Sequence, residues 1–383
     1  MTKLDELIQE LCPDGVEYKE LQEILTIKNG SDYKHLSKGD IPVYGSGGIM
    51  TYVETFSYDK PSVLIPRKGS IDKLYYVEAP FWNVDTIFYT DIDSTQIKPK
   101  YLFYCLQREH LEQYNTAGGV PSLTQAVLNK VQIPVPPQPV QREIVRILDN
   151  FTELTTELTT ELTAELTARK KQYEFYRDKL LDFAGNTDVK NVLLGDIAKF
   201  VYGYTDKAKE TGSVRFVRIT DISEDGRLNP YDAKYVELTD ESKKYLLKKG
   251  DLLLARTGAT YGKTLYFEED EPAVYASFLI KIILDNSVIK NRYYWHFSKS
   301  SLYWEQAERY VSKGGQQQFN TNAVSRVIVP IPSLEVQDRI IYVLDNFDAI
   351  CTDLSSGLPA EIEARQKQYE YYRDKLLSFE EKI

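Results

Sequence analysis

Val140–Phe151, V-Q-R-E-I-V-R-I-L-D-N-F, recurs at Val336–Phe347 as V-Q-D-R-I-I-Y-V-L-D-N-F. Arg169–Phe183, R-K-K-Q-Y-E-F-Y-R-D-K-L-L-D-F, recurs at Arg365–Phe379 as R-Q-K-Q-Y-E-Y-Y-R-D-K-L-L-S-F. The copies align without a gap at a constant offset of 196 residues, so the chain contains an internal duplication. Apolar residues recur at helical spacing in each copy, which predicts a helix of about 45 residues and about 68 Å. Such a helix is too long for one small domain, so it predicts a connection between domains.

The first copy carries a four-residue repeat, T-E-L-T-T-E-L-T-T-E-L-T-A-E-L-T (Thr152–Thr167), between its duplicated ends. A period of four exceeds 3.6 by about 40° per repeat, so the leucines follow a stripe that winds slowly around the helix. The stripe comprises Leu154, Leu158, Leu162 and Leu166, and in the second copy Ile350, Leu354, Leu358 and Ile362. Gly357-Leu358-Pro359 should break or kink the second helix. The simplest partner for each stripe is the other copy, which predicts two long antiparallel helices.

The start of the chain resembles the end of the first repeated helix, because residues between Asp5 and Gly30 match residues between Asp178 and Gly203 at an offset of 173. This predicts a cyclic order of domain, helix, domain and helix with pseudo-two-fold symmetry. The predicted fold class is α+β, with two mixed α/β domains joined and spaced by the two long helices. The predicted boundaries are residues 1–137 for the first domain with its N-terminal helix, 138–185 for the central helix, 186–333 for the second domain and 334–383 for the distal helix.

The composition is typical of a soluble globular protein with two or three domains, since 42% of the 383 residues are hydrophobic and 27% are charged. No apolar run approaches the about 18 residues that span a bilayer, and acidic residues stand where a secretory signal would be basic. We therefore expect a cytoplasmic protein. The three cysteines are far apart and the three histidines are not at ligand spacing, so we expect neither structural zinc nor a disulfide framework.

The net charge of −10 is unevenly distributed along the chain. Residues 190–320 carry a net charge of +2 and residues 20–130 carry −2, while the other segments hold most of the acid. Each central block is therefore close to neutral. Either could bind phosphates through a local basic patch, although neither resembles a strong DNA binder on its own.

Three strings resemble enzyme motifs but lack essential parts. Gly45-Ser46-Gly47-Gly48 lacks the third glycine of a dinucleotide-binding fingerprint, so we interpret it as a turn. The carboxylates Asp14 and Glu17 are too close in sequence for the hairpin of a metal-dependent nuclease. Asn229-Pro230-Tyr231 lacks the second proline with which an amino-methyltransferase grips a flipped base. The sequence therefore predicts no catalytic constellation.

The remaining polar segments are loops suited to nucleic acid. Strand-like Ser62–Pro66 and Asp251–Ala255 each lead into a basic, glycine-containing loop, Arg67–Lys73 or Arg256–Lys263. Basic side chains and glycine backbone can approach phosphates there, and arginine can also pair with guanine edges. Tight turns with solvated charges would give the same pattern.

A second loop with two glycines follows a predicted aromatic-rich helix late in each block, at Tyr101–Tyr114 and at Tyr293–Tyr310. The later loop, Lys313–Asn320, carries glutamine and asparagine, which pair bidentately with adenine in the major groove. The earlier loop, Gly118–Thr124, is less polar. The candidate DNA-binding residues of the four loops are Arg67, Lys68, Ser70, Lys73, Ser122, Thr124, Arg256, Thr257, Tyr261, Lys263, Lys313, Gln316, Gln317, Gln318 and Asn320.

Two unlike α/β domains joined by duplicated helices, with a TELT/AELT repeat ahead of R-K-K-Q-Y-E-F-Y-R-D-K-L-L, resemble the specificity (S) subunit of type I restriction-modification systems. The resemblance is to the subgroup with four-residue, TAEL-like central repeats. C-P-D-G-V-E-Y-K-E-L (Cys12–Leu21) and G-D-L-L-L-A-R-T-G-A-T-Y-G-K (Gly250–Lys263) extend it to nearly the whole chain. It implies that each variable domain is a target recognition domain for one half of a bipartite double-stranded DNA target.

The resemblance also implies the partners and the division of chemistry. The helices would set the spacer between the half-sites and dock two modification (M) subunits, with restriction (R) subunits in the full complex and no membrane. The chain itself would be non-catalytic and would bind no cofactor. The M subunits would bring S-adenosylmethionine and DNA adenine methylation, and the R subunits would bring ATP and Mg.

Two other interpretations of the sequence stay open at this point. A coiled-coil scaffold with two protein-binding domains would explain the helices but not two unlike domains that each carry a polar glycine-rich loop. A self-sufficient methyltransferase would need the cofactor and base-gripping motifs that the sequence lacks. The bases that each domain would recognise cannot be deduced from the sequence, because loop geometry decides them.

Overall fold

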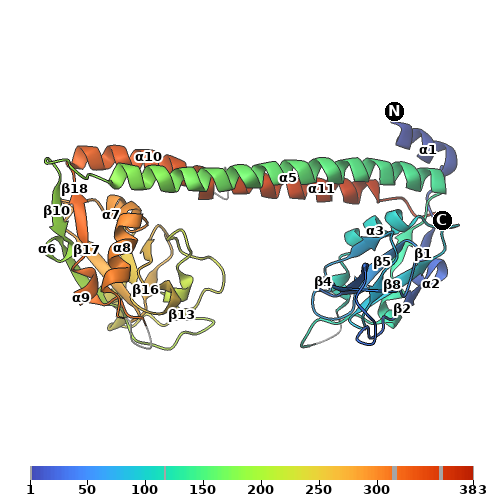
Figure 1. Cartoon of the computed structure of the whole chain (residues 1–383), viewed down its shortest axis with the longest axis horizontal. Helices are drawn as coiled ribbons and strands as arrows, with labels where there is room; N and C mark the ends of the chain where they lie inside the picture. Colours follow the sequence, from blue (N-terminus) through green and yellow to red (C-terminus); the bar gives the residue numbers. More distant parts are fainter. Residues whose placement is uncertain (1, 116–117, 313–316, 353–356, 383) are drawn as a thin grey trace. The chain divides into compact units, whose positions relative to one another are not determined.

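The computed structural model describes residues 2–115, 118–312, 317–352 and 357–382, which form two compact units (Figure 1). Unit 1 comprises Met1–Glu161 with Ile362–Ile383, and unit 2 comprises Leu162–Glu361. Each unit contains a mixed α/β domain together with parts of the long helices. None of the helices in the described part of the chain combines the length and the apolar character that a membrane span requires.

The α/β domain of unit 1 contains three small sheets. One has the strand order β2-β8-β5-β6, another has the order β4-β3-β7, and β1 pairs with β9. The elements are α1 (Lys3–Leu11), β1 (Tyr18–Glu20), α2 (Leu21–Ile24), β2 (Leu25–Lys28), β3 (Ile41–Gly45), β4 (Gly48–Val53), β5 (Ser62–Pro66), β6 (Tyr75–Val77), β7 (Trp82–Asn83), β8 (Ile87–Ile92), α3 (Pro99–Arg108), the 3₁₀ turn η1 (Leu111–Tyr114), α4 (Gln125–Leu128) and β9 (Gln132–Pro134).

Strand β5 is buried along its whole length. Because side chains alternate along a strand, Val63 and Ile65 enter the main core of unit 1, whereas Leu64 packs with Phe81 in a smaller cluster on the other face. A run of branched apolar residues therefore forms a central strand that is covered on both faces.

The α/β domain of unit 2 also contains three small sheets. One has the strand order β11-β17-β14-β15, another has the order β13-β12-β16, and β10 pairs with β18. The elements are β10 (Lys190–Leu193), α6 (Leu194–Ile197), β11 (Ala198–Tyr202), β12 (Val214–Val217), η2 (Ile219–Asp221), β13 (Tyr235–Val236), η3 (Ser242–Tyr245), β14 (Leu252–Ala255), η4 (Gly258–Thr260), β15 (Thr264–Tyr266), β16 (Ala273–Tyr275), β17 (Leu279–Leu284), α7 (Asn291–Phe297), α8 (Ser301–Tyr310), α9 (Thr321–Val324) and β18 (Ile328–Ile331).

The two domains have the same topology although their sequences differ. Each has a four-stranded antiparallel sheet and a three-stranded sheet in which one pair is parallel, β3 with β7 or β12 with β16. Each also has a two-stranded sheet, whose first strand directly precedes a short helix, α2 or α6, and whose second strand lies just before a long helix. The duplication that the sequence reveals in the helices therefore extends to the variable domains at the level of the fold.

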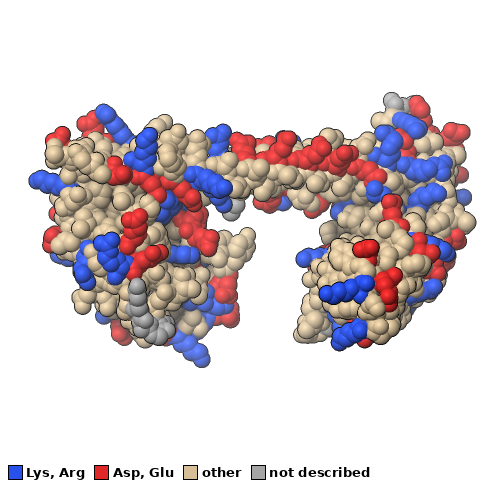
Figure 2. All heavy atoms as spheres, in the orientation of Figure 1, with Lys and Arg blue, Asp and Glu red and all other residues tan. Residues whose placement is uncertain are grey.

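Helix α5 (Gln138–Leu181) is continuous over 44 residues. Its first part enters the core of unit 1 through Val140, Ile144 and Leu148, and its last part enters the core of unit 2 through Tyr173 and Leu181. The winding of the leucine stripe is visible in the exposed fractions, which are 63% for Leu154 and 8% for Leu162. Acidic side chains gather along the middle of α5 (Figure 2).

The second copy of the duplication forms two helices, α10 (Leu334–Thr352) and α11 (Leu358–Leu376). Pro359 lies in the first turn of α11, where the missing backbone N–H costs no hydrogen bond. Leu354 of the predicted stripe lies outside the described residues. In the cores, Ile340 and Leu344 of α10 belong to unit 2, and Leu377, just after α11, belongs to unit 1.

The two predicted aromatic helices are each interrupted, which corrects the prediction of one continuous helix per block. In unit 1, α3 ends at Arg108, and His110 has a left-handed φ of 46° before the 3₁₀ turn η1. In unit 2, α7 ends at Phe297, and the hydroxyl of Ser300 caps the new helix α8 by accepting from the Tyr303 N–H. In unit 2, local capping therefore overrides the apolar periodicity.

Candidate nucleic-acid interface

The two candidate loops of unit 1 lie side by side. The Leu123 N–H donates to the Arg67 carbonyl at 2.9 Å, and the Gly69 N–H donates to the Pro121 carbonyl at 3.1 Å. Lys68 and Ser122 form a β-bridge between these contacts. Buried Leu123 anchors the second loop in the main core of unit 1.

The two candidate loops of unit 2 meet in the same way. The Phe319 N–H donates to the Arg256 carbonyl at 2.7 Å, and Thr257 forms a β-bridge with Gln318. The Thr257 hydroxyl also donates to the Gln317 carbonyl at 3.1 Å. Because the offset of 196 residues aligns Ser122 with Gln318, the bridges occupy equivalent positions. The sequence identifies each loop, and the structure adds that the loops are paired.

The arginine that opens each basic loop is half-buried against aromatic rings. Arg67 lies 5.3 Å from the ring centre of Phe88. Arg256 lies 5.2 Å from the ring centre of Tyr202 and 5.4 Å from that of Phe278, and its Nε donates to the Ser277 carbonyl at 3.1 Å. These contacts hold each guanidinium in a defined direction, as a side chain that contacts DNA requires.

The other candidates differ in how far they can reach a ligand. Lys68, Lys73, Gln317 and Gln318 are exposed, whereas Thr257 is buried and acts through its bond to Gln317. The half-buried candidates are Ser70, whose carbonyl accepts from the Lys73 N–H, Ser122, whose N–H donates to Asn115, and Tyr261, whose ring packs on Trp304. Lys313 and Gln316 lie outside the described residues.

Two candidates have a structural role that explains their residue type. The side chain of Thr124 accepts from the Val127 N–H at 3.4 Å and caps α4. The side chain of Asn320 accepts from the Ala323 N–H at 3.1 Å and caps α9. Thr124 and Asn320 are equivalent under the offset of 196, so a polar cap at the end of the second loop is a shared feature of both units.

The duplicated V-Q motif attaches each domain to its long helix. The Gln141 side chain accepts from the Lys98 N–H at 2.7 Å at the start of α3. The Gln337 side chain accepts from the Lys290 N–H at 2.9 Å at the start of α7. Both glutamines are fully buried, and each also donates to two carbonyls. Fully satisfied buried amides of this kind favour one orientation of domain and helix within each unit.

The duplicated L-D-N-F motif provides a second attachment. Asp149 accepts from Lys100 at 2.9 Å and from the Tyr104 hydroxyl at 2.6 Å. In unit 2 the equivalent Asp345 lies 2.7 Å from both Arg292 Nε and His296 Nε2. Burial lowers the pKa of His296 to about 4, and the bond to Asp345 opposes this shift only in part.

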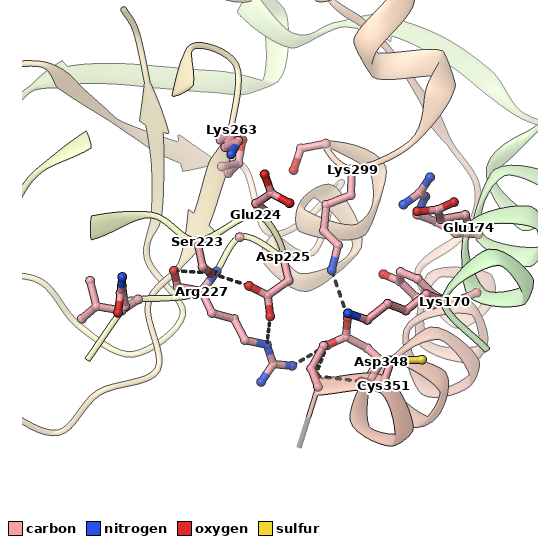
Figure 3. A pocket seen from close by; sticks show the side chains of 18 of the residues that line it. Lys170, Glu174, Ser223, Glu224, Asp225, Arg227, Lys263, Lys299, Asp348 and Cys351 are labelled. Carbon is pink, nitrogen blue, oxygen red and sulfur yellow. Dashed lines mark hydrogen bonds and ion pairs between the residues drawn. The ribbon is translucent and has the colours of Figure 1, made fainter. Parts of the chain in front are cut away.

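A third polar contact, at Asp348 of α10, was missed from the sequence. Its carboxylate is 2% exposed and accepts from Arg227 and, at 3.0 Å, from Lys299 (Figure 3). Burial raises the pKa of this carboxyl, but the charges of Lys299 and Arg227 outweigh burial and hold the pKa below its usual value. The equivalent residue in unit 1 is the uncharged Thr152, so an alignment of the two copies would have shown the difference.

A cavity of about 1100 Å³ lies beside this contact within unit 2 (Figure 3). It is bounded by residues 223–231, the last part of α5 and the end of α10. Both acidic and basic side chains line it. The candidate Lys263 lines this cavity, whereas the exposed Gln317 and Gln318 do not. In the ranges that the structure describes, no group of three or more metal-binding side chains is present.

The architecture is that of a chain with two α/β modules of one topology, each with a paired-loop surface and each fastened to long duplicated helices. The model of the type I restriction modification DNA specificity domain matches residues 13–168 and 186–364. The chain belongs to this family of type I restriction-modification specificity subunits.

Individual relatives agree with this assignment. The putative type I restriction enzyme specificity subunit S.HindORF215P of Haemophilus influenzae is 34% identical, over 95% of this chain and 96% of the relative. The EcoR124I/EcoR124II specificity subunit of Escherichia coli is 32% identical, over 76% of this chain and 73% of the relative. A chain solved in a study of complex assembly and conformational transition of the type I R-M system has a TM-score of 0.68 at 15% identity, covering 96% of this chain and 98% of its own length. This last similarity concerns the fold.

Proposed function

We propose that each α/β domain reads one half of a bipartite double-stranded DNA target through its paired loops. The observation that supports this most strongly is the equivalent pairing at Lys68–Ser122 and Thr257–Gln318 in two domains of unlike sequence. A shared scaffold with different exposed side chains is what two readers of different half-sites require.

The four-residue repeats would make α5 a ruler between the half-sites, as in the subgroup of specificity subunits with such repeats. On this proposal residues 1–137 and 186–333 are the target recognition domains, and residues 138–185 and 334–383 are antiparallel spacer helices related by a pseudo-two-fold axis. The continuity of α5 and the start of α10 at Leu334 support these limits.

Two modification subunits would dock on an aromatic patch that occurs once in each unit. In unit 1 the rings of Phe151 and Tyr372 lie 5.8 Å apart, and Tyr371 beside them is exposed. In unit 2 the equivalent rings of Phe347 and Tyr176 lie 5.7 Å apart. Clustered exposed aromatic residues on a helix are typical of protein interfaces.

The duplication of this patch supports two copies of one partner, since equivalent surfaces bind the same protein. In unit 2 the third ring of the patch is Phe175, which is equivalent to Tyr371 and 61% exposed. The acid along α5 would favour a basic partner surface between the patches (Figure 2).

The chain would contribute recognition and no chemistry of its own. The modification subunits would supply S-adenosylmethionine and the adenine methylation site, and restriction subunits with ATP and Mg would complete the system. The near-neutral domains fit this division, because a reader that acts within a larger complex leaves much of the phosphate neutralisation to its partners.

The test of this proposal is to map methylated adenines across the genome of cells with and without this chain. We expect one bipartite motif, two short half-sites separated by unread bases, to lose its methylation when the chain is removed. Unchanged methylation at every bipartite motif would contradict the proposal and favour a scaffold without a DNA role. A preparation of this chain shown to be free of other subunits should transfer no methyl group to DNA.

A further inference from the structure

The turn at Gly45–Gly48, which the sequence offers only as a failed nucleotide-binding motif, lies beside the paired loops of unit 1. It joins β3 to β4 as a two-residue hairpin turn, with Gly45 paired to Gly48. A Cβ atom on Gly69 of the basic loop would lie 3.8 Å from the Ser46 hydroxyl oxygen. We call residues 45–48 the hairpin tip.

Thr86 fixes the hairpin tip to the basic loop. Its hydroxyl accepts from the Ser46 N–H at 3.4 Å, and its carbonyl accepts from the Arg67 N–H at 3.0 Å. The Tyr75 hydroxyl adds a bond to the Ser46 carbonyl at 3.3 Å. Since Gly69 also bonds to Pro121 of the second loop, three segments of unit 1 meet at one end of the four-stranded sheet.

In unit 2 a third segment also lies beside the paired loops, although it is not a hairpin turn. Gly258 has the place of Gly69 in its basic loop, and both have positive φ, 75° and 82°. A Cβ atom on Gly258 would lie 3.7 Å from Ile219, which follows β12 as Ser46 follows β3. A third segment beside the paired loops is therefore common to both domains.

The exposed surface of the hairpin tip is suited to close approach by a ligand. Apart from Gly47 itself and its two neighbours in the chain, no described residue has an atom within 4 Å of a Cβ placed on exposed Gly47, and the φ of Gly47 is outside the left-handed region. Ile49, the second residue of β4, is 50% exposed. Charges around the tip are mixed, with Lys68 and Lys73 from the basic loop and exposed acidic side chains at positions 72 and 85.

We infer that the hairpin tip is a third base-reading element of unit 1, in which Gly47 allows the backbone to approach the DNA groove and Ile49 offers an apolar contact. The inference rests on the proposed DNA-reading function and deepens it. The major groove admits a two-stranded β-ribbon, and apolar side chains there recognise the thymine methyl group. Neither the surrounding atoms nor the backbone conformation requires a glycine at position 47. A residue without a side chain at the tip of such a ribbon lets the backbone come close to DNA.

The test compares Gly47→Glu, Gly47→Ala and Ser94→Glu in the assembled complex with its modification subunits. Gly47→Glu places a carboxylate at the tip, whereas Ser94→Glu adds the same charge to the exposed turn at the other end of β8. Methylation rates are measured on the target and on targets with single changes in either half-site. Thermal unfolding of each variant shows that the domain is intact.

We expect Gly47→Glu to slow methylation at least about tenfold and Gly47→Ala, which adds only a methyl group, to slow it by a smaller factor of more than about twofold, while Ser94→Glu changes it less than about twofold. Ile49→Thr should alter the base preference within one half-site and leave the other half-site unchanged. Gly47→Glu at the wild-type rate with unchanged base preference would overturn the inference. If Lys68→Ala and Gln318→Ala also left both half-sites unchanged, the proposed function itself would fail.

Discussion

Replacement of Asp348 by asparagine should strongly destabilise unit 2. The carboxylate is 2% exposed and faces two cations from separate segments, Lys299 after α7 and Arg227 in the loop after β12. A neutral amide at this position would leave the largely buried Lys299 without its counter-charge and, among the described residues, would leave the partly exposed Arg227 with only Asp225, at 3.7 Å. Removal of one partner from a buried ion pair costs about 3–5 kcal/mol, and partial exposure of Arg227 places the expected loss near the lower limit.

The measurement is urea unfolding followed by tryptophan fluorescence. Lys299 Nζ lies 3.7 Å from the ring centre of Trp295, so the emission of this residue reports on the Asp348 contact. A Trp82→Phe background removes the tryptophan of unit 1 from the signal. A loss of about 3 kcal/mol should lower the urea midpoint by about 1 M or more.

The matched control is Asp240→Asn, which removes a carboxylate from an ion pair with Lys243 at the surface of the same unit. Asp240 is 96% exposed, so its loss should change stability by less than about 1 kcal/mol. Equal midpoints for the two variants would contradict this prediction, because Asp348 would then behave as a solvated surface charge.

Three further predictions concern pH, base reading and the long helix. Burial lowers the pKa of His296 from the ordinary 6.5 to about 4, so the unfolded chain binds a proton at a higher pH than the folded chain does. The free energy of unfolding of unit 2 should therefore fall by up to ~3 kcal/mol as the pH is lowered from 6.5 to 4. His296→Asn should reduce this pH dependence in unfolding experiments. Alanine at both Gln317 and Gln318 should weaken the recognition of one half-site only, measured as methylation, by ~1–3 kcal/mol for each bidentate pairing with a base that is removed. Equal weakening in both half-sites would exclude base reading by this loop. Leu148→Ala should lower the free energy of unfolding by about 2–5 kcal/mol, because Leu148 lies in the core of unit 1. Leu154→Ala should lower it by less than about 0.5 kcal/mol, because Leu154 is exposed. Similar losses for the two variants would contradict the assigned packing.

The sequence predicted those features that repeat along the chain. The duplicated apolar positions that identify the long helices are the ones that enter the cores, such as Ile144 in unit 1 and Ile340 in unit 2. The Gly-Leu-Pro segment predicted the interruption between α10 and α11 because a proline inside a helix loses a hydrogen bond.

Features that depend on tertiary contacts could not be predicted from local patterns. The pairing of Thr257 with Gln318 joins segments 61 residues apart, and nothing in either loop specifies its partner. A threonine or asparagine next to a glycine-rich loop suits DNA binding and helix capping equally, so the capping by Thr124 and Asn320 needed the structure. The common topology of the two domains is also hidden, because the same strands are built from different apolar residues.

Two separate DNA readers spaced by a helix are tested most directly by deletion of one four-residue repeat, Thr156–Thr159, from α5. The measurement is the methylated DNA motif of this variant with its partner subunits present. The deletion shortens α5 by about 6 Å, against roughly 3.4 Å per base pair, and rotates the register by about 40°. We expect both half-site sequences to persist and the unread spacer to change by one or two base pairs. An unchanged spacer with full activity, or an altered half-site sequence, would contradict two separate readers spaced by the helix.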